Sequence, residues 1–137
     1  MIVADTGIVV ALVDADDGHH EIARRLFEQQ AAEWVLPWAI LPEVDYLLGA
    51  HVGAAAEKAF LRDVAEARLA VAWGDEADLA RARAIDEKYA SLRLGLVDAV
   101  VIAIAERLQA TAIATLDLRH IGAVEIRGSP KLLPRDA

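Results

Sequence analysis

The sequence predicts an α/β domain, in which a mainly parallel sheet of four to five strands lies between two layers of helices. Short apolar runs alternate with longer segments whose apolar residues recur at helical spacing, and this alternation is typical of strand–helix–strand units. With 137 residues, 56% of them hydrophobic, the chain can bury a substantial core. No repeat, linker or low-complexity stretch divides it, so we expect residues 1–137 to form one three-layer α/β/α domain.

The first half of the chain alternates strands and helices. In order, we expect a strand at residues 1–4, a helix from residue 6, an amphipathic helix within residues 19–30, a strand at 34–36 and a helix that begins near residue 43. The amphipathic helix is indicated by apolar residues at helical spacing with charges on the other side. Pro42 suits the first turn of the next helix, because an amide there has no intrahelical partner.

The second half continues the alternation. We expect a helix at residues 57–67, strands at 69–73, 111–115 and 123–127, a helix at 75–89 capped by Asp75, and a helix over residues 94–109. This last helix is apolar almost all round, which predicts that it is buried in the middle of the domain. Residues 128–137 contain two prolines and are expected to form a partly ordered tail.

Composition limits where the protein can act. The chain has no cysteine, which excludes disulfides and thiolate metal sites and fits the cytoplasm. Its first residues carry Asp5 and no basic leader, unlike a signal peptide, and its longest apolar run is too short to cross a bilayer. The net charge of −8 is unusual for a nucleic-acid binder, but four acids that held metal would leave only 18 acids against 14 bases.

Two acidic residues follow predicted strands. Asp5 comes directly after the first strand, and Asp117 comes two residues after the strand at 111–115. Ligands of open parallel sheets bind beyond the carboxyl ends of the strands, which makes both residues candidates for a site. Ordinary structural roles are also open to them, since Asp5 can cap the following helix and Asp117 can be a polar turn residue.

Asp98 interrupts a segment, residues 94–105, that holds no other charged side chain. A buried, ionised carboxylate costs several kcal/mol unless a cation or hydrogen-bond donors compensate it. The alternative is that Asp98 lies in the first helical turn and only interacts with the helix dipole. That role does not explain why so apolar a helix carries an acid, so Asp98 is also a candidate site residue.

Glu43 has a weaker signal, because an acid beside a proline in a first helical turn is common. Asp45 competes with it, but the two residues lie about 200° apart around a helix, so only one can face a given site. Carboxylates that converged on one pocket would repel each other without a metal. Oxygen ligands without cysteine or paired histidines point to Mg²⁺ or Mn²⁺, which suit phosphodiester cleavage.

The residues around these four acids resemble a known family. The segments are Asp5-Thr6 after an apolar strand, Glu43 with Val44, Leu47 and Leu48, then Leu96-Val97-Asp98-Ala99, then Thr115-Leu116-Asp117-Leu118-Arg119-His120. In this order and at this spacing they resemble the motifs of PIN domains, and those of VapC-like toxins in particular, over nearly the whole chain. The departures are Gly7, where these toxins often have serine, and Ile121, where they often have an aromatic residue.

The resemblance implies an activity and its partners. It implies a Mg²⁺-dependent endoribonuclease, with Mn²⁺ able to substitute, that forms a homodimer and is silenced by a VapB-like antitoxin. Asp5 and Asp98 would then be the principal metal ligands, while Glu43 and Asp117 would complete the catalytic cluster of acids.

Other residues near these motifs could support the site. Thr6 and Thr115 match hydroxyl positions that form hydrogen bonds within such sites. Arg93 and Arg119 could orient carboxylates or bind phosphate, and structural ion pairs are equally open to them. A lone histidine in a turn, such as His120, is more often merely solvated. The aromatic residues around Glu43 (Trp34, Trp38 and Tyr46) could line a partner groove or fill the core.

Three other functions fit parts of the sequence. Asp5-Thr6-Gly7 is also the catalytic tripeptide of aspartic proteases, which would require a nearly all-β fold, as in a retropepsin-like dimer. A phosphoacceptor receiver domain would need an acidic neighbour for Asp5, and none is present. A PIN-like module that has lost catalysis and only binds its partners is a third alternative.

Overall fold

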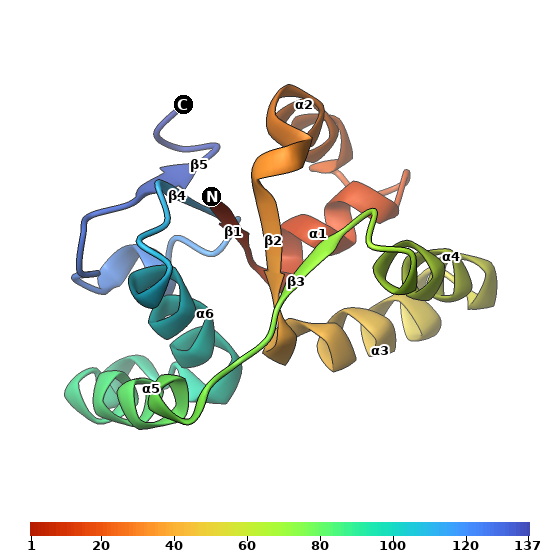
Figure 1. Cartoon of the computed structure of the whole chain (residues 1–137). Coiled ribbons are helices and arrows are strands. Elements are labelled where there is room, and N and C mark those ends of the chain that lie inside the picture. The colour runs from red at the N-terminus through yellow and green to blue at the C-terminus, as the bar shows by residue number, and fades with distance from the viewer.

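The computed structural model describes all 137 residues, which form a five-stranded sheet covered by helices on both sides (Figure 1). The strands are β1 (Ile2–Ala4), β2 (Trp34–Pro37), β3 (Ala70–Ala72), β4 (Ala112–Ala114) and β5 (Lys131–Leu133). The α-helices are α1 (Thr6–Val13), α2 (His20–Gln30), α3 (Leu41–His51), α4 (Ala54–Ala65), α5 (Glu76–Lys88) and α6 (Gly95–Arg107). The predicted fold class is confirmed.

The sheet has the strand order β3-β2-β1-β4-β5, and every neighbouring pair is parallel. The central strand β1 pairs on one side with β2, where Ile2 lies opposite Trp34, and on the other with β4, where Ile2 lies opposite Ala112. All three residues of β1 are buried, as expected for the middle of a parallel sheet covered on both faces.

The helices form two layers. Helices α1 to α4 lie on one side of the sheet, and α5 and α6 lie on the other (Figure 1). Helix α6 packs against β1 and β2, and its residues 99–105 are all buried, as predicted for a helix that is apolar almost all round. None of the helices combines the length and the apolar character that crossing a bilayer would require.

The fifth strand lies at Lys131–Leu133, so the prediction of a strand at residues 123–127 was wrong. Residues 121–123 form a 3₁₀ turn, and the alternation of apolar and charged residues at 124–127 pairs with no strand. The prediction of a partly ordered tail at 128–137 was wrong as well. Leu132 and Leu133 are buried against β4, and the flanking Pro130 and Pro134 are tolerated because the strand is short and lies at the sheet edge.

The fold also excludes one of the alternative functions. A retropepsin-like protease would be nearly all β, whereas this domain has six α-helices and a parallel sheet. The protease interpretation of Asp5-Thr6-Gly7 is therefore excluded.

Candidate active site

The candidate site lies where the chain reverses its direction of travel across the sheet. From β1 the chain proceeds to β2 and β3, and then crosses back to place β4 on the other side of β1. The carboxyl ends of β1 and β4 therefore adjoin at the topological switch point, which is the usual place for a ligand in such sheets. Asp5 directly follows β1, and Asp117 follows β4 after Thr115 and Leu116.

All four predicted acids line one pocket at this point. It has a volume of about 480 Å³ and is lined by Asp5, Thr6, Gly7, Glu43, Leu47, Asp98, Leu116 and Asp117. The acids come from four different elements, namely the ends of β1 and β4 and the first turns of α3 and α6. The structure thus brings together side chains that are up to 112 positions apart in the sequence (117 − 5).

Asp5 is held by hydrogen bonds to both carboxylate oxygens. The backbone N–H of Thr6 donates to Oδ1 at 2.7 Å, and the hydroxyl of Thr115 donates to Oδ2 at 2.9 Å. Burial raises the pKa of the Asp5 carboxyl, while these two hydrogen bonds oppose the rise. Asp5 is also the N-cap of α1, so the structural role and the position in the pocket belong to the same residue.

Asp98 has no comparable support. It lies in the first turn of α6, yet its carboxylate accepts no hydrogen bond and forms no ion pair. Burial, followed by the nearby negative charges of Asp5 and Asp117, raises the pKa of Asp98 to about 7, while His120 opposes the rise. An acid with no donor, surrounded by other acids, leaves a local deficit of positive charge.

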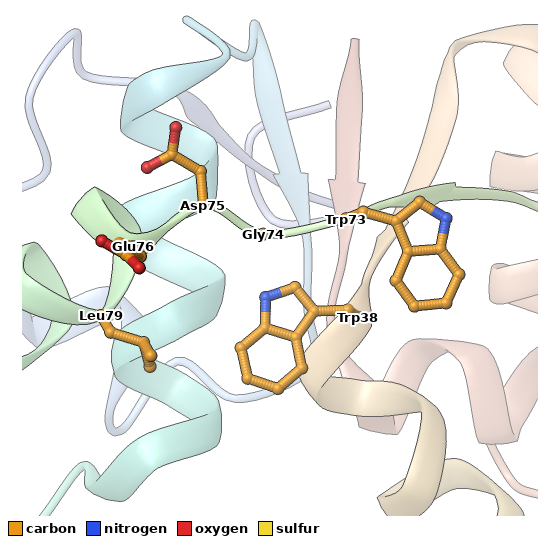
Figure 2. Close-up of a pocket in the computed structure, with 6 residues that line it drawn as sticks. All are labelled: Trp38, Trp73, Gly74, Asp75, Glu76 and Leu79. Carbon is orange, nitrogen blue, oxygen red and sulfur yellow. The ribbon is translucent and has the colours of Figure 1, made fainter.

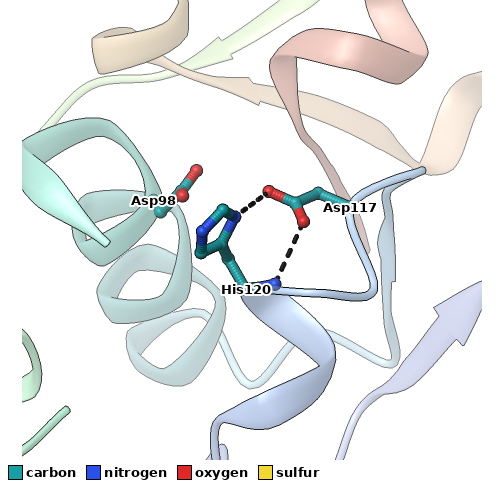
Figure 3. Close-up of side chains that lie close together, drawn as sticks. All are labelled: Asp98, Asp117 and His120. Carbon is teal, nitrogen blue, oxygen red and sulfur yellow. Dashed lines mark hydrogen bonds and ion pairs between the residues drawn. The ribbon is translucent and has the colours of Figure 1, made fainter. Parts of the chain in front are cut away.

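Asp117 is bound to His120, which lies beside Asp98 (Figure 3). The backbone N–H of His120 donates to Asp117 Oδ1 at 3.0 Å, and Nδ1 of the imidazole lies 2.9 Å from Oδ2. His120 is therefore part of the acidic cluster and is not a merely solvated turn residue. The sequence signal for this contact was the spacing of three residues between Asp117 and His120. In a turn, the carboxylate of an aspartate often accepts a hydrogen bond from a backbone N–H a few residues further on.

Glu43 and Asp45 point to different places, as their separation around a helix requires. Glu43 lines the pocket, whereas Asp45 lies against Glu57 of α4 and raises the pKa of that carboxyl. Glu43 is largely exposed, which makes it the least enclosed of the four acids.

The residues present fit a divalent cation. Asp98, Asp117 and His120 each offer a ligand atom, and these atoms lie within 4.8 Å of one another. Asp5 and Glu43 line the same pocket but lie outside this tightest group. The hydroxyl of Thr6, which also lines the pocket, is buried and has no hydrogen-bond partner. A cation or its waters would supply both the missing charge and the missing partner.

The two arginines near the motifs form no ion pair. Arg93 and Arg119 are exposed, and neither orients a carboxylate of the pocket through a hydrogen bond. Of the aromatic residues near Glu43, Trp34 fills the core, where it packs edge to face against Phe27. Trp38 lines a separate pocket, and Tyr46 is exposed.

Comparison with known sequences gives a consistent result. The protein-family model of the PIN domain matches residues 2–125 of this chain. The chain is 32% identical over 122 residues to Ribonuclease VapC26 of Mycobacterium tuberculosis, which covers 89% of this chain and 90% of that protein.

Solved structures share the fold. VapC20 of M. tuberculosis, described as a Sarcin-Ricin loop cleaving toxin, superposes with a TM-score of 0.79 at 22% identity, covering 93% of this chain and 99% of that one. VapBC2 from Rickettsia felis, bound to a DNA fragment from its promoter, gives a TM-score of 0.71 at 15% identity, with 96% and 97% covered. FitAcB from Neisseria gonorrhoeae gives a TM-score of 0.64 at 13% identity, and the match covers 96% of each chain.

Proposed function

Because the chain belongs to the PIN-domain family, we propose that it is a Mg²⁺-dependent endoribonuclease and the toxin of a toxin–antitoxin pair. The observation that carries the proposal is Asp98, a partly buried acid without a donor that shares one pocket with three other acids. Such a cluster is stable in its ionised form only when a cation lies within it. The ribonuclease name of the relative with 32% identity supports RNA as the substrate.

We assign the metal-binding and catalytic roles to the four acids. Asp5 and Asp98 would hold the ion as principal ligands, and Asp117 and Glu43 would complete the site directly or through water. Mg²⁺, for which Mn²⁺ can substitute, would lower the pKa of a water molecule and stabilise negative charge on the attacking and leaving oxygens.

The remaining residues position these acids. Thr115 holds Asp5 through its hydroxyl and also accepts a hydrogen bond from the backbone N–H of Asp117 at 3.0 Å, so one side chain links both strand ends. Thr6 offers its unpartnered hydroxyl to a water or an RNA oxygen in the pocket. His120 fixes the orientation of Asp117.

In the reaction, a water oxygen attacks the phosphorus in line with the leaving oxygen. The bond between phosphorus and the 3′ oxygen breaks, and the proton lost by the water is balanced by protonation of that oxygen. The products are a 5′-phosphate and a 3′-hydroxyl.

The acidic surface restricts how RNA can bind. With a net charge of −8, the protein offers no broad basic surface for phosphates. Arg93 and Arg119 are exposed and free of ion pairs, so they are available to bind phosphates beside the pocket.

We also propose that the protein acts in the cytoplasm, is silenced by a VapB-like antitoxin and assembles as a homodimer. The likeness to the VapBC2 and FitAcB structures supports the antitoxin. The homodimer and the location rest on the family resemblance.

The test is RNA cleavage with Mg²⁺ or Mn²⁺, with and without EDTA, by the wild type and by Asp98→Asn. We expect cleavage that requires the metal and is lost in the variant. If no RNA is cut under any metal condition, the nuclease proposal fails and a binding module without catalysis takes its place. A small DNA-binding protein encoded in the neighbouring reading frame would support the toxin assignment.

A further inference from the structure

The imidazole of His120 lies between two acids of the pocket, Asp117 and Asp98 (Figure 3). Its Nδ1 lies 2.9 Å from Oδ2 of Asp117, whereas its Nε2 has no hydrogen-bond partner. The side chain is 35% exposed, so an ion can reach the ring from solvent. One ring nitrogen is therefore held in place, and the other is open to a ligand.

The contact with Asp117 decides which nitrogen of His120 carries the proton. A carboxylate accepts hydrogen bonds and has no proton to donate, so Nδ1 is the donor in this pair. In a neutral imidazole the lone pair then lies on Nε2. Histidines that bind metals in proteins usually have this arrangement, in which a carboxylate accepts from one ring nitrogen while the other nitrogen binds the metal.

Asp98 supplies an oxygen close to this ring. One ligand atom from each of Asp98, Asp117 and His120 lies within 4.8 Å of the other two. Two ligand atoms of one small divalent ion, each about 2.0–2.2 Å from it, lie at most about 4.4 Å apart. A small movement of the side chains therefore closes the group on an ion, which would also give Asp98 the positive partner that it lacks.

A second observation, independent of the charges, indicates that the pocket accommodates a polar ligand. Thr6 is 5% exposed, and its hydroxyl lines the same pocket without a hydrogen-bond partner. Buried hydroxyl groups in native proteins are rarely left unpaired. An ion that carries its own water molecules into the pocket would supply the missing partner.

No other part of the molecule brings three such side chains this close together. The pocket of about 440 Å³ beside Trp73 also holds two acids, Asp75 and Glu76, but no histidine (Figure 2). Asp75 is moreover engaged as the cap of α5, where it accepts a hydrogen bond from the N–H of Ala77. The combination of acids with an imidazole is therefore specific to the pocket at the carboxyl ends of β1 and β4.

We propose that His120 is a direct nitrogen ligand of the metal, through Nε2, and that this ligand makes the site prefer transition-metal ions to Mg²⁺. The inference rests on the proposed function, because it requires a divalent cation in the pocket, and it adds a ligand and a selectivity. Mg²⁺ prefers oxygen ligands and gives up water reluctantly. Imidazole nitrogen favours first-row transition-metal ions, with an affinity that rises from Mn²⁺ to Co²⁺. Asp117 then also acts through His120, because it holds the ring in the form that binds metal.

Two substitutions separate the ligand role of His120 from its contact with Asp117. His120→Asn keeps an N–H near the position of Nδ1, which can still donate to Asp117, but it has no atom in place of Nε2. His120→Gln places an amide oxygen near the position of Nε2 and so exchanges a nitrogen ligand for an oxygen ligand. His51→Asn is the matched control, because His51 is exposed at the end of α3 and lies outside the pocket.

The first experiment measures the affinity of the full chain for Co²⁺ and for Mg²⁺ by titration calorimetry in the absence of RNA. We expect His120→Asn to weaken Co²⁺ binding by about 10- to 100-fold and Mg²⁺ binding by less than about threefold, because only the transition metal gains from the nitrogen. His120→Gln should also lose the preference for Co²⁺. His51→Asn should keep both affinities of the wild type.

The second experiment detects the nitrogen directly. Pulsed electron paramagnetic resonance of the full chain loaded with Mn²⁺ should show coupling of the metal to a nitrogen nucleus. Histidine labelled with the heavier stable isotope of nitrogen should change this coupling in the wild type. The coupling should be absent from His120→Asn and present in His51→Asn. Because the labelled wild type carries no substitution, this test does not depend on the folding of any variant.

The outcomes separate this inference from the proposed nuclease. Equal losses of Co²⁺ and Mg²⁺ affinity in His120→Asn, or a coupling that histidine labelling leaves unchanged, would overturn the inference and leave His120 as a residue that only positions Asp117. The RNA-cleavage test would be untouched by that result. A wild type that shows the histidine coupling but cuts no RNA with any metal would support the inference and overturn the nuclease.

Discussion

The hydroxyl of Thr115 donates a hydrogen bond of 2.9 Å to Asp5, a residue 110 positions away in the sequence. The bond joins the carboxyl ends of β1 and β4 and fixes the orientation of a buried carboxylate. The same Thr115 oxygen accepts from the N–H of Asp117, so its removal affects two of the four acids.

We therefore expect Thr115→Val to weaken metal binding by about 10- to 100-fold, the usual effect of losing a partner that orients a ligand. It should also lower the free energy of unfolding by about 1–3 kcal/mol, because Asp5 Oδ2 and the N–H of Asp117 lose a partner. Titration calorimetry with Mn²⁺ measures the first effect and urea unfolding the second. Thr115→Ser should restore both, and Thr111→Val is the matched control, since Thr111 binds Met1 at the opposite end of β4. Equal effects of the two valine variants would contradict this role.

Asp98→Asn should stabilise the metal-free protein at pH 8 while it lowers cleavage by at least about 100-fold. The stabilisation arises because the variant removes a carboxylate that burial and neighbouring acids disfavour. The shift from 3.8 to about 7 corresponds to at most about 4 kcal/mol, and partial exposure of the side chain makes the gain smaller. Urea unfolding in EDTA measures it. Asp16→Asn, at an exposed acid without a side-chain hydrogen bond, should change nothing.

The metal-free protein should lose stability as the pH rises from about 4 to about 7. Because the pKa of Asp98 is higher in the folded protein, the folded state holds the proton more tightly than the unfolded chain within this interval. The stabilisation from this proton is complete below the unfolded pKa and is lost once the pH passes about 7. The test is the urea concentration at the midpoint of unfolding, measured in EDTA across this pH interval. A midpoint that rises steadily with pH in the wild type but not in Asp98→Asn would contradict the prediction.

Metal binding should depend on pH in the opposite direction. Below about pH 7 the ion must displace a proton from Asp98, so the affinity should rise with pH and level off above that value. Calorimetry in two buffers with different enthalpies of ionisation should detect about one proton released per site near pH 6 and almost none at pH 8. The same proton release from Asp98→Asn would show that another group is responsible.

The pairing of α5 with α6 depends on Asp78, which is 2% exposed and receives two hydrogen bonds from Arg107, at 2.7 and 3.0 Å. Asp78→Ala should cost about 2–4 kcal/mol, since it removes a buried partner and also ends the capping of the backbone N–H of Asp75. Urea unfolding measures the loss. Glu28→Ala, which breaks an exposed pair with Arg24, should stay within about 0.5 kcal/mol of the wild type.

The sequence predicted most of the fold because its strands and helices differ clearly in length and spacing. The exception was the last strand, where the alternating pattern around Val124 looked more strand-like than Leu132 and Leu133 between two prolines. Pairing with β4 decided this point, and periodicity cannot reveal pairing.

The site was predictable to a different extent at each residue. Asp98 stood out because its surroundings are apolar, and Asp5 because it ends a strand, whereas Glu43 depended on the family resemblance. The contacts between His120 and Asp98 and between Thr115 and Asp5 depend on how distant segments fold together. No local pattern announces such contacts.

The placement of β1 between β2 and β4 also bears on synthesis of the protein. Asp5 leaves the ribosome first, yet its partner Thr115 and the neighbouring Asp117 follow only after more than 100 further residues. Until β4 has been made and paired, the chain lacks one wall of the acidic pocket, and the late closure of so distant a contact delays folding further. A nascent or truncated chain that ends before residue 115 therefore carries an incomplete pocket, which delays any cutting of RNA until translation is nearly finished.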